Sequence, residues 1–401
     1  MKHLRIQGNL LLLLFGTGAM GAPVVGALRE SVQQAAGLSR AQLGLWIFVI
    51  GLAGGTLGLI LAIVMRRTVR ATFVRAGAVC LFAGCLVLTL VRPGHGWPLL
   101  AAAFAWFLLR VGHPMAGASN GIFADLWESS PHTGLISLHA VNSLGKLAAP
   151  VAVVLLGAAI RPTAIAFTVL FGALAVESLF WPRASLDHLR DVELGRETQQ
   201  RIRFPRDPLV WACALQFVFI TGAEAGATSI LGSLVSSLRP SPVGWIGTER
   251  WASVALIVMI SGIFVGRTVF ELLSVRLTEQ AIVAVCACCS IFCVPAAFLG
   301  KAEAYVPALF LAGVGFSALW PAFFGLAARA YPAERTFLSL GAMFFSGIGM
   351  WGAVYMASAI GNADRYLPYA FVASALLLVP FILFLFLTPY GRALRAGPHP
   401  R

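Results

Sequence analysis

Charged residues are scarce in this sequence, and acidic residues are the scarcest of them. Only 11% of the 401 residues are charged, and 29 Lys and Arg stand against 16 Asp and Glu. Soluble domains carry about 25% charged residues, so a soluble globular protein is excluded. The apolar residues form runs of about 20 instead of amphipathic stripes, which is the pattern of membrane-spanning helices. The sequence therefore predicts an integral membrane protein.

Other missing patterns exclude further classes of protein. No nucleophile is placed with a base, so we expect no enzyme. No soluble basic face with interleaved aromatic residues exists, so we expect no nucleic-acid partner. The apolar stretch Leu10–Phe15 continues as a full-length span, so we expect no cleaved signal peptide. Cys286, Cys289 and Cys293 share a helical face, but no His or carboxylate lies nearby. We therefore expect no metal and no cofactor.

Polar residues divide the chain into apolar segments joined mostly by short connections, which make neighbouring helices antiparallel. With this topology, 18 Lys and Arg fall on one set of ends and loops, 8 on the opposite set and 3 within segments. Because basic residues near span ends mark the cytoplasmic side, we expect both termini in the cytoplasm and the protein in the inner membrane. The twelve segments are 9–29, 41–65, 71–91, 98–123, 135–159, 163–182, 208–236, 251–274, 279–298, 304–328, 336–360 and 367–388.

One connection is long and polar, and it separates two similar halves. Residues 182–207 hold six Arg and five acidic residues. FGTGAMG at 15–21 matches FITGAEA at 219–225, and RVGHPMAG at 110–117 matches GVGFSALW at 313–320, with offsets of 204 and 203 residues. NSLGK at 142–146 matches the spacing around Gly347 with an offset of 202. The predicted units are a six-helix bundle at 1–182, a cytoplasmic linker at 183–207 and a second six-helix bundle at 208–401.

Two related bundles with a site between them are typical of rocking secondary transporters. The sequence resembles the major facilitator superfamily, and within it the fucose-permease-like branch of sugar:proton symporters. The resemblance covers nearly the whole chain and implies an all-α membrane protein of twelve transmembrane helices in two pseudo-symmetric six-helix bundles. The stretches that carry it are LHAVNSLGKLAAP (138–150), GFSALWPAFFGL (315–326), FITGAEAG (219–226), GIFVGRTVFELLSVR (262–276) and LLRVGHPMAG (108–117).

The sequence also departs from the pattern of that family. Met65 and Val275 stand where the two loop motifs of the superfamily carry Asp. Ala116 stands where proton-coupled sugar transporters of the branch carry a carboxylate, and His139 replaces their Gln. The familiar pair of acids for sugar–proton symport is therefore missing.

Ionised side chains inside apolar segments are costly, so each should face a cavity or a partner. Glu224 lies among small residues in the seventh segment, which lines the central cavity in the family. The first half offers Arg110, His113 and Lys146 near the midplane. We expect Glu224, Lys146 and His113 to act in proton coupling or as a charge pair. A static tie between Glu224 and Lys146 or Arg110 is the alternative, and His113 can equally be a packing residue.

The remaining charges have other expected roles. Arg267 and Glu271 are four residues apart on one helix, so we expect them to pair and to hold a gate together with Arg276 near the cytoplasmic end. We expect Glu177 to pair with arginines of the linker. The predicted substrate-binding side chains are Asn120, His139, Asn142, Ser317, Trp320 and Arg110.

The predicted function is secondary active transport of a small organic solute by alternating access, with coupling to a proton. The resemblance favours a sugar-like or polar metabolite and a monomeric protein in the lipid bilayer. Sparse polarity of the cavity lining favours an alternative, efflux of an amphipathic or drug-like compound. A third interpretation is a non-transporting sensor or scaffold on a degenerate transporter fold. It is based on Met65 and Val275, which replace the Asp of the two loop motifs.

Overall fold

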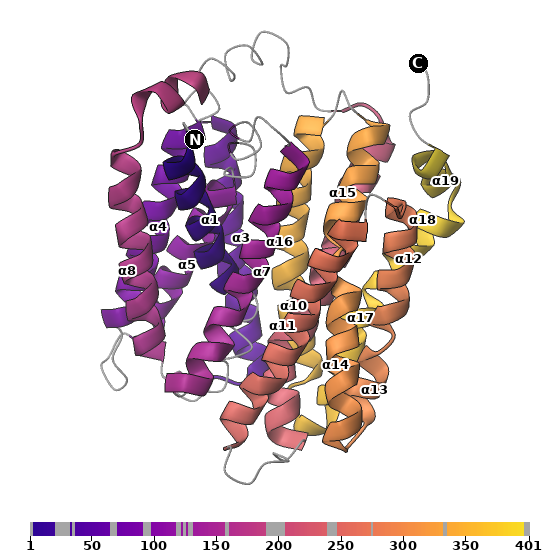
Figure 1. Ribbon diagram of the computed structural model, residues 1–401. Helices are drawn as coiled ribbons and strands as arrows, with labels where there is room; N and C mark the ends of the chain where they lie inside the picture. Colours follow the sequence, from indigo (N-terminus) through magenta and orange to yellow (C-terminus); the bar gives the residue numbers. More distant parts are fainter. Residues whose placement is uncertain are drawn as a thin grey trace.

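The described helices form two groups that stand side by side with their axes roughly parallel (Figure 1). The computed structural model describes residues 3–20, 33, 37–64, 70–90, 98–117, 122, 126, 131–156, 160–189, 205–238, 247–273, 276–331 and 335–396. Within these residues every regular element is helical. The start of α1 and helix α19 lie at the same end of the molecule (Figure 1).

Each group has its own buried apolar core. In the first group the core runs from Ile6 to Leu189, and in the second from Val210 to Leu394. The first group consists of α1 (Leu4–Ala19), α3 (Arg40–Val64), α4 (Arg70–Leu90), α5 (Pro98–Gly117), α7 (Pro131–Leu156) and α8 (Ile160–Leu179). The second consists of α10 (Pro208–Leu238), α11 (Thr248–Leu273), α12 (Glu279–Ser290), α13 (Cys293–Phe298), α14 (Ala302–Ser317), α15 (Leu319–Ala330), α16 (Arg335–Ile360), the short helix η3 (Asp364–Tyr366), α17 (Leu367–Leu376), α18 (Leu378–Leu387) and α19 (Pro389–Ala396).

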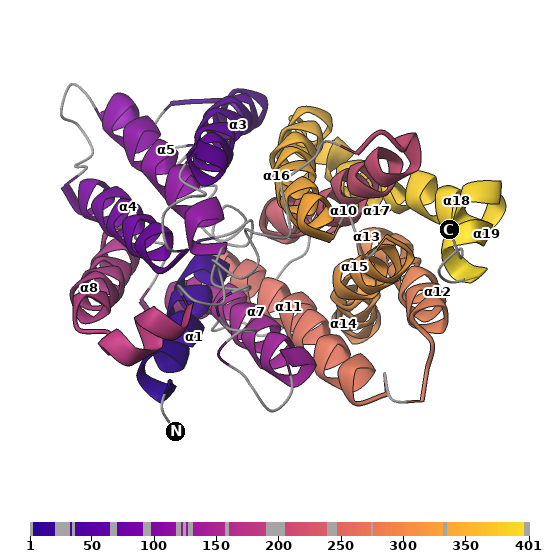
Figure 2. The same cartoon turned by 90° about the horizontal axis from the view of Figure 1, so that it is seen from above.

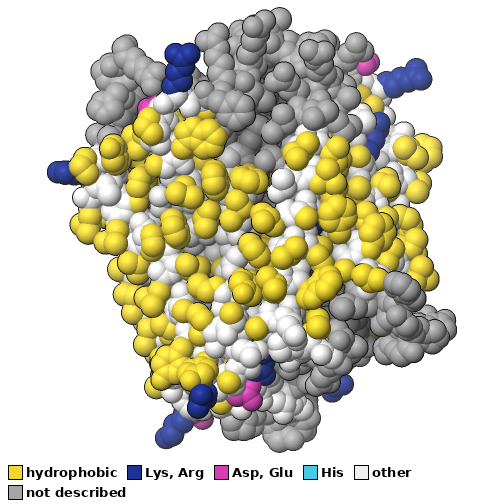
Figure 3. Space-filling view, turned by 180° about the vertical axis from the view of Figure 1, so that it is seen from behind, with side chains coloured by type: hydrophobic (Ala, Val, Ile, Leu, Met, Phe, Trp, Pro, Cys, Tyr) yellow, Lys and Arg dark blue, Asp and Glu magenta, His cyan; other side chains and the backbone are white. Residues whose placement is uncertain are grey.

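Eight helical stretches of the described chain are long and apolar enough to cross a membrane. A ninth arises if α8 and the helix Arg183–Leu189, which are bent by 87° at a short break, count as one span. On the face that Figure 3 shows, apolar side chains form a broad band between the grey regions, and Lys and Arg side chains lie toward the two ends. A lipid-facing surface has this appearance, since charged side chains are placed in the polar interfaces. The protein is therefore a multi-pass membrane protein, and the number of twelve spans stays a prediction.

Several predicted segments are broken helices, and proline explains where. Proline cannot donate to the carbonyl four residues before it, and its ring crowds that carbonyl. Pro321 follows the break between α14 and α15 at Ala318, and Pro295 and Pro380 follow the breaks before α13 and α18. The carbonyl of Ser317 is thereby left free for another partner.

Close helix packing repeats in the two groups. A Cβ placed on Gly145 of α7 would strike the backbone of Phe15 on α1, and one placed on Gly349 of α16 would strike the backbone of Val218 on α10. These glycines are 204 residues apart, which agrees with the offsets of the other matched motifs. The sequence alignment to Gly347 was wrong by two residues, because Gly347 has no neighbouring chain within 4 Å of its Cβ position.

The most extensive contacts between the two groups run along two helix pairs. Helix α3 packs against α16, and α7 packs against α11 (Figure 2). The long, mostly buried helix α10 contacts α16, α11 and α17 within its own group. Polar side chains on α7, α10 and α11 therefore meet where the groups face each other.

Candidate functional site

Glu224 on α10 is the anion at the centre of the contact between the two groups. Lys146 on α7 donates a hydrogen bond to its Oε1, so an ion pair joins the groups. Arg267 on α11 lies on the other oxygen, with 3.6 Å between Nη2 and Oε2. The three side chains are only 12–16% exposed. The structure thus brings together the residues predicted as a charge pair, and it adds Arg267 to them.

Arg267 was expected at a cytoplasmic gate, and its position here is a correction. Its Nε donates to the Ser317 carbonyl at 2.9 Å, and its Nη1 donates to Ser143 Oγ on α7 at 2.7 Å. The Ser317 carbonyl is available because Pro321 cannot bond to it. A partner within one helical turn was predicted, but the long side chain reaches partners on α7, α10 and α14 instead. The side chain of Glu271 lies outside the described residues.

Arg276, the third residue of the predicted gate, is exposed, and its role there stays a prediction. Arg276 follows α11 at the surface, and its side chain makes no hydrogen bond or ion pair with the described residues. The structure places Glu177, the expected partner of the linker, in an ion pair with Arg5 on α1 instead. The proximity of α1 and α8 decides this pairing.

Arg110 on α5 is enclosed by aromatic rings, and its role in solute binding stays a prediction. It is 2% exposed and donates to the Met20 carbonyl. Its guanidinium carbon lies 4.1 Å from the ring centre of Trp106 and 4.4 Å from that of Trp351, which belongs to α16 of the other group. Such cation–π contacts stabilise a desolvated guanidinium. Arg110 therefore connects the groups, and the described part of the chain holds no carboxylate paired with it.

The other predicted site residues make separate contacts and do not form one cluster. Asn142 donates to the Leu14 carbonyl at 2.9 Å and so ties α7 to α1. Buried His113 Nδ1 has no hydrogen-bond partner. The Ser317 hydroxyl donates to the Val314 carbonyl. Asn120 and the side chain of His139 lie outside the described residues, although His139 itself belongs to α7.

Trp320 belongs to an aromatic and hydroxyl cluster beside Glu224. Its indole nitrogen donates to Ser346 Oγ at 3.0 Å, and Thr221, one turn before Glu224, donates to the same oxygen at 3.0 Å. The Trp320 ring stacks on Phe324 with 5.4 Å between centroids. Sequence reasoning missed Thr221 and Ser346, since single hydroxyl residues are common in membrane helices.

A second set of contacts joins the two groups at the end opposite the start of α1. Arg40, at the start of α3, pairs with Asp364 beyond α16. Nearby, a Cβ on Gly44 would strike Ser358, and a Cβ on Gly51 would strike Trp351, so α3 and α16 pack without intervening space. These contacts were not predicted, because charges at span ends look like ordinary surface charges.

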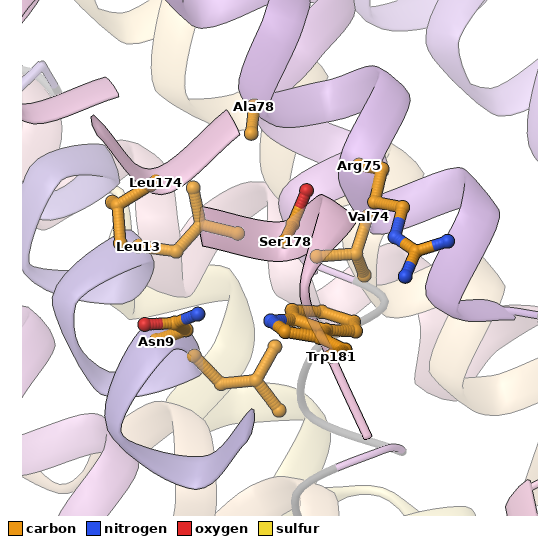
Figure 4. Close-up of a pocket in the computed structure, with 9 residues that line it drawn as sticks. Asn9, Leu13, Val74, Arg75, Ala78, Leu174, Ser178 and Trp181 are labelled. Carbon is orange, nitrogen blue, oxygen red and sulfur yellow. The ribbon is translucent and has the colours of Figure 1, made fainter. Parts of the chain in front are cut away.

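The small pocket in Figure 4 is separate from this region. Asn9, Arg75, Ser178 and Trp181 line it together with apolar residues of α1, α4 and α8, all in the first group. It has room for about one water molecule, and it contains none of the central ionised residues.

The cysteines of the described chain are free, and no cluster suited to a metal occurs within that part.

Comparison with solved structures identifies the fold. The chain is similar to the E. coli fucose:proton symporter, with a TM-score of 0.61 and 17% identity over 98% of this chain and 99% of that one. It is similar to a D-xylose–proton symporter, with a TM-score of 0.72 and 12% identity over 98% of each chain. For a nucleoside transporter the TM-score is 0.64, with 15% identity over 98% and 99% of the two chains. No protein-family model and no curated protein sequence matches the chain.

At these identities the likeness shows the fold. The chain has the transporter fold that its resemblance to the major facilitator superfamily predicted, and a fucose permease is among its structural neighbours. These neighbours are transporters and not enzymes.

Proposed function

We propose that the chain is a secondary transporter that moves a small polar solute across the inner membrane by alternating access. The moving units are the bundles 1–182 and 208–401, joined by the cytoplasmic linker 183–207. Both termini lie in the cytoplasm, and the protein works as a monomer.

The buried ion pair between Lys146 and Glu224 supports this function most directly. Each ion costs about 2.5–3.5 kcal/mol at the centre of a membrane helix on insertion scales. The pair joins the two groups of helices, so it must break whenever the bundles rock apart at this level. A site that releases its own counter-ion in each cycle can accept a solute or a proton in its place.

Proton coupling follows from the same geometry. When Lys146 withdraws, the Glu224 carboxylate loses a neighbouring positive charge and takes up a proton more readily. Arg267 stays on the same group as Glu224 and keeps the carboxylate oriented. In this mechanism Glu224 carries the proton, and the solute occupies the space between Lys146 and Arg267.

The test is proton exchange by the purified protein in detergent during addition of sugars, organic acids and amphipathic cations. We expect at least one solute to move protons with the native protein and not with Glu224→Gln. The variant is matched in shape, so loss of the response reports on the charge. A solute that binds both proteins and moves protons equally in each would make Glu224 a structural tie.

A further inference from the structure

The central site holds more positive than negative charge. Lys146 and Arg267 both lie on the single carboxylate of Glu224, and Arg110 has no carboxylate partner within the described residues. In the described part of the chain, these four side chains make no hydrogen bond or ion pair beyond those given above. Lys146, Arg267 and Glu224 together therefore carry a net charge of about +1 in their ordinary ionised forms.

Such an excess is unfavourable in a membrane interior unless something compensates it. A static tie needs one cation for one anion, and a second buried cation adds a desolvation cost. A neutral sugar brings no charge to balance it, and an amphipathic cation would increase it. The excess is favourable only if the site also receives an anion.

We propose that the transported solute is an organic anion whose carboxylate or phosphate group replaces Glu224 on Lys146 and Arg267. This inference rests on the proposed function and names the chemical class of its substrate.

The geometry around Arg267 suits such a ligand. Ser317 and Ser143 hold its Nε and Nη1, so the guanidinium is fixed in place. Its Nη2 makes no hydrogen bond, because the Glu224 oxygen is 3.6 Å away. Lys146 has three N–H donors and uses one on Glu224. A fixed guanidinium edge beside an ammonium group is a strong recognition pair for a carboxylate or a phosphate.

Exchange of the two carboxylates also explains why a proton would accompany the solute. If the anion alone enters, two carboxylates compete for two cations. If a proton enters with it, protonated Glu224 becomes neutral and the solute takes its place. The anion alone brings the net charge of the site from about +1 to zero, and a proton on Glu224 then frees both cations for the solute.

Matched pairs of acid and neutral solute test the proposal with the full-length protein in detergent. The probes are glucuronate against glucose and lactate against glycerol, together with tetraphenylphosphonium as an amphipathic cation. Binding is measured by calorimetry, and proton exchange is measured in the same samples. We expect at least one acid to bind about tenfold more tightly than its neutral partner.

Three variants separate recognition from structure. Arg267→Lys keeps the positive charge but loses the planar guanidinium that can bind a carboxylate through two N–H groups. It should therefore weaken acid binding about tenfold. Glu224→Gln removes the competing carboxylate, so it should tighten acid binding and abolish proton exchange. Arg250→Gln changes an exposed arginine near the start of the same helix and should change nothing.

The outcomes distinguish this inference from the proposed function. Equal binding of an acid and its neutral partner, or weaker acid binding by Glu224→Gln, would overturn the anion class and leave transport standing. Acid binding that is unaffected by Arg267→Lys would do the same. Absence of binding for every probe, together with no uptake of any of them in reconstituted vesicles, would overturn both.

Discussion

Lys146 and Glu224 form an ion pair that joins α7 of one helix group to α10 of the other, with side-chain exposures of 14% and 16%. The two residues are 78 positions apart in the sequence. Burying these two charges in the membrane interior costs free energy, and the pair lies where the groups must separate. A residue pair of this kind is a natural place for coupling between solute, proton and conformation.

The two residues should be energetically coupled. We expect Lys146→Met to destabilise the protein by about 2 kcal/mol, since Glu224 keeps Arg267 beside it but loses the hydrogen bond from Lys146. Glu224→Gln together with Lys146→Met should cost less than the two single changes added. The check is thermal unfolding in detergent over the double-mutant cycle. Strictly additive effects would contradict an ion pair in the folded protein.

The ion pair of Arg40 and Asp364 should act as a latch at the closed end. Asp364 is 59% exposed, so Asp364→Asn should cost at most about 1 kcal/mol of stability. The same loss should raise the population open at this end by up to about fivefold. Ser358→Cys, buried against Gly44, reports this opening through its labelling by a membrane-impermeant maleimide.

A matched control exists within one helix group. Arg329→Gln removes the 2.7 Å contact with Glu279 and involves only α15 and α12. Labelling of Ser358→Cys should stay at its basal rate in that background. If both backgrounds label alike, the Arg40–Asp364 pair is an ordinary surface contact.

Much of the fold could be predicted from the apolar runs alone. The segments 41–65, 208–236 and 336–360 became α3 (40–64), α10 (208–238) and α16 (335–360). Apolar runs do not mark interruptions, so the break between α14 and α15 was missed although Pro321 signals it. The signal is local and physical, because proline leaves the carbonyl four residues earlier without its helical partner.

The site was harder to predict than the helices. Glu224 and Lys146 were conspicuous, because an ionised residue in an apolar run needs a partner. Arg267 was assigned to Glu271 because spacing within one helix is visible in the sequence, while the approach of α7, α10 and α14 is not. Arg267 donates to the Ser317 carbonyl instead. That carbonyl is available only because the helix breaks between α14 and α15.

Trp351 should stabilise Arg110 through its ring. We expect Trp351→Phe to lower stability by about 1 kcal/mol, because the smaller ring offers a weaker face to the guanidinium and fills less space. Trp351→Leu should cost more, since no π face remains. The measurement is thermal unfolding, with Arg110→Met as the second background. The change from Phe to Leu at 351 should lose its effect there; an undiminished effect would assign Trp351 to packing alone.

The two closely packed glycines should respond alike to one added methyl group. Gly145→Ala and Gly349→Ala each place a Cβ against backbone, of Phe15 and Val218, which cannot move aside as a flexible side chain can. We expect both variants to lose most of the folded protein, measured by size-exclusion chromatography after extraction from the membrane. Gly347→Ala is the control, since nothing lies within 4 Å of its Cβ. It should be neutral or more stable by up to about 1 kcal/mol, because Gly is a poor helix former. A tolerated Gly349→Ala beside a lethal Gly145→Ala would show that the helix approach is not repeated in the two groups.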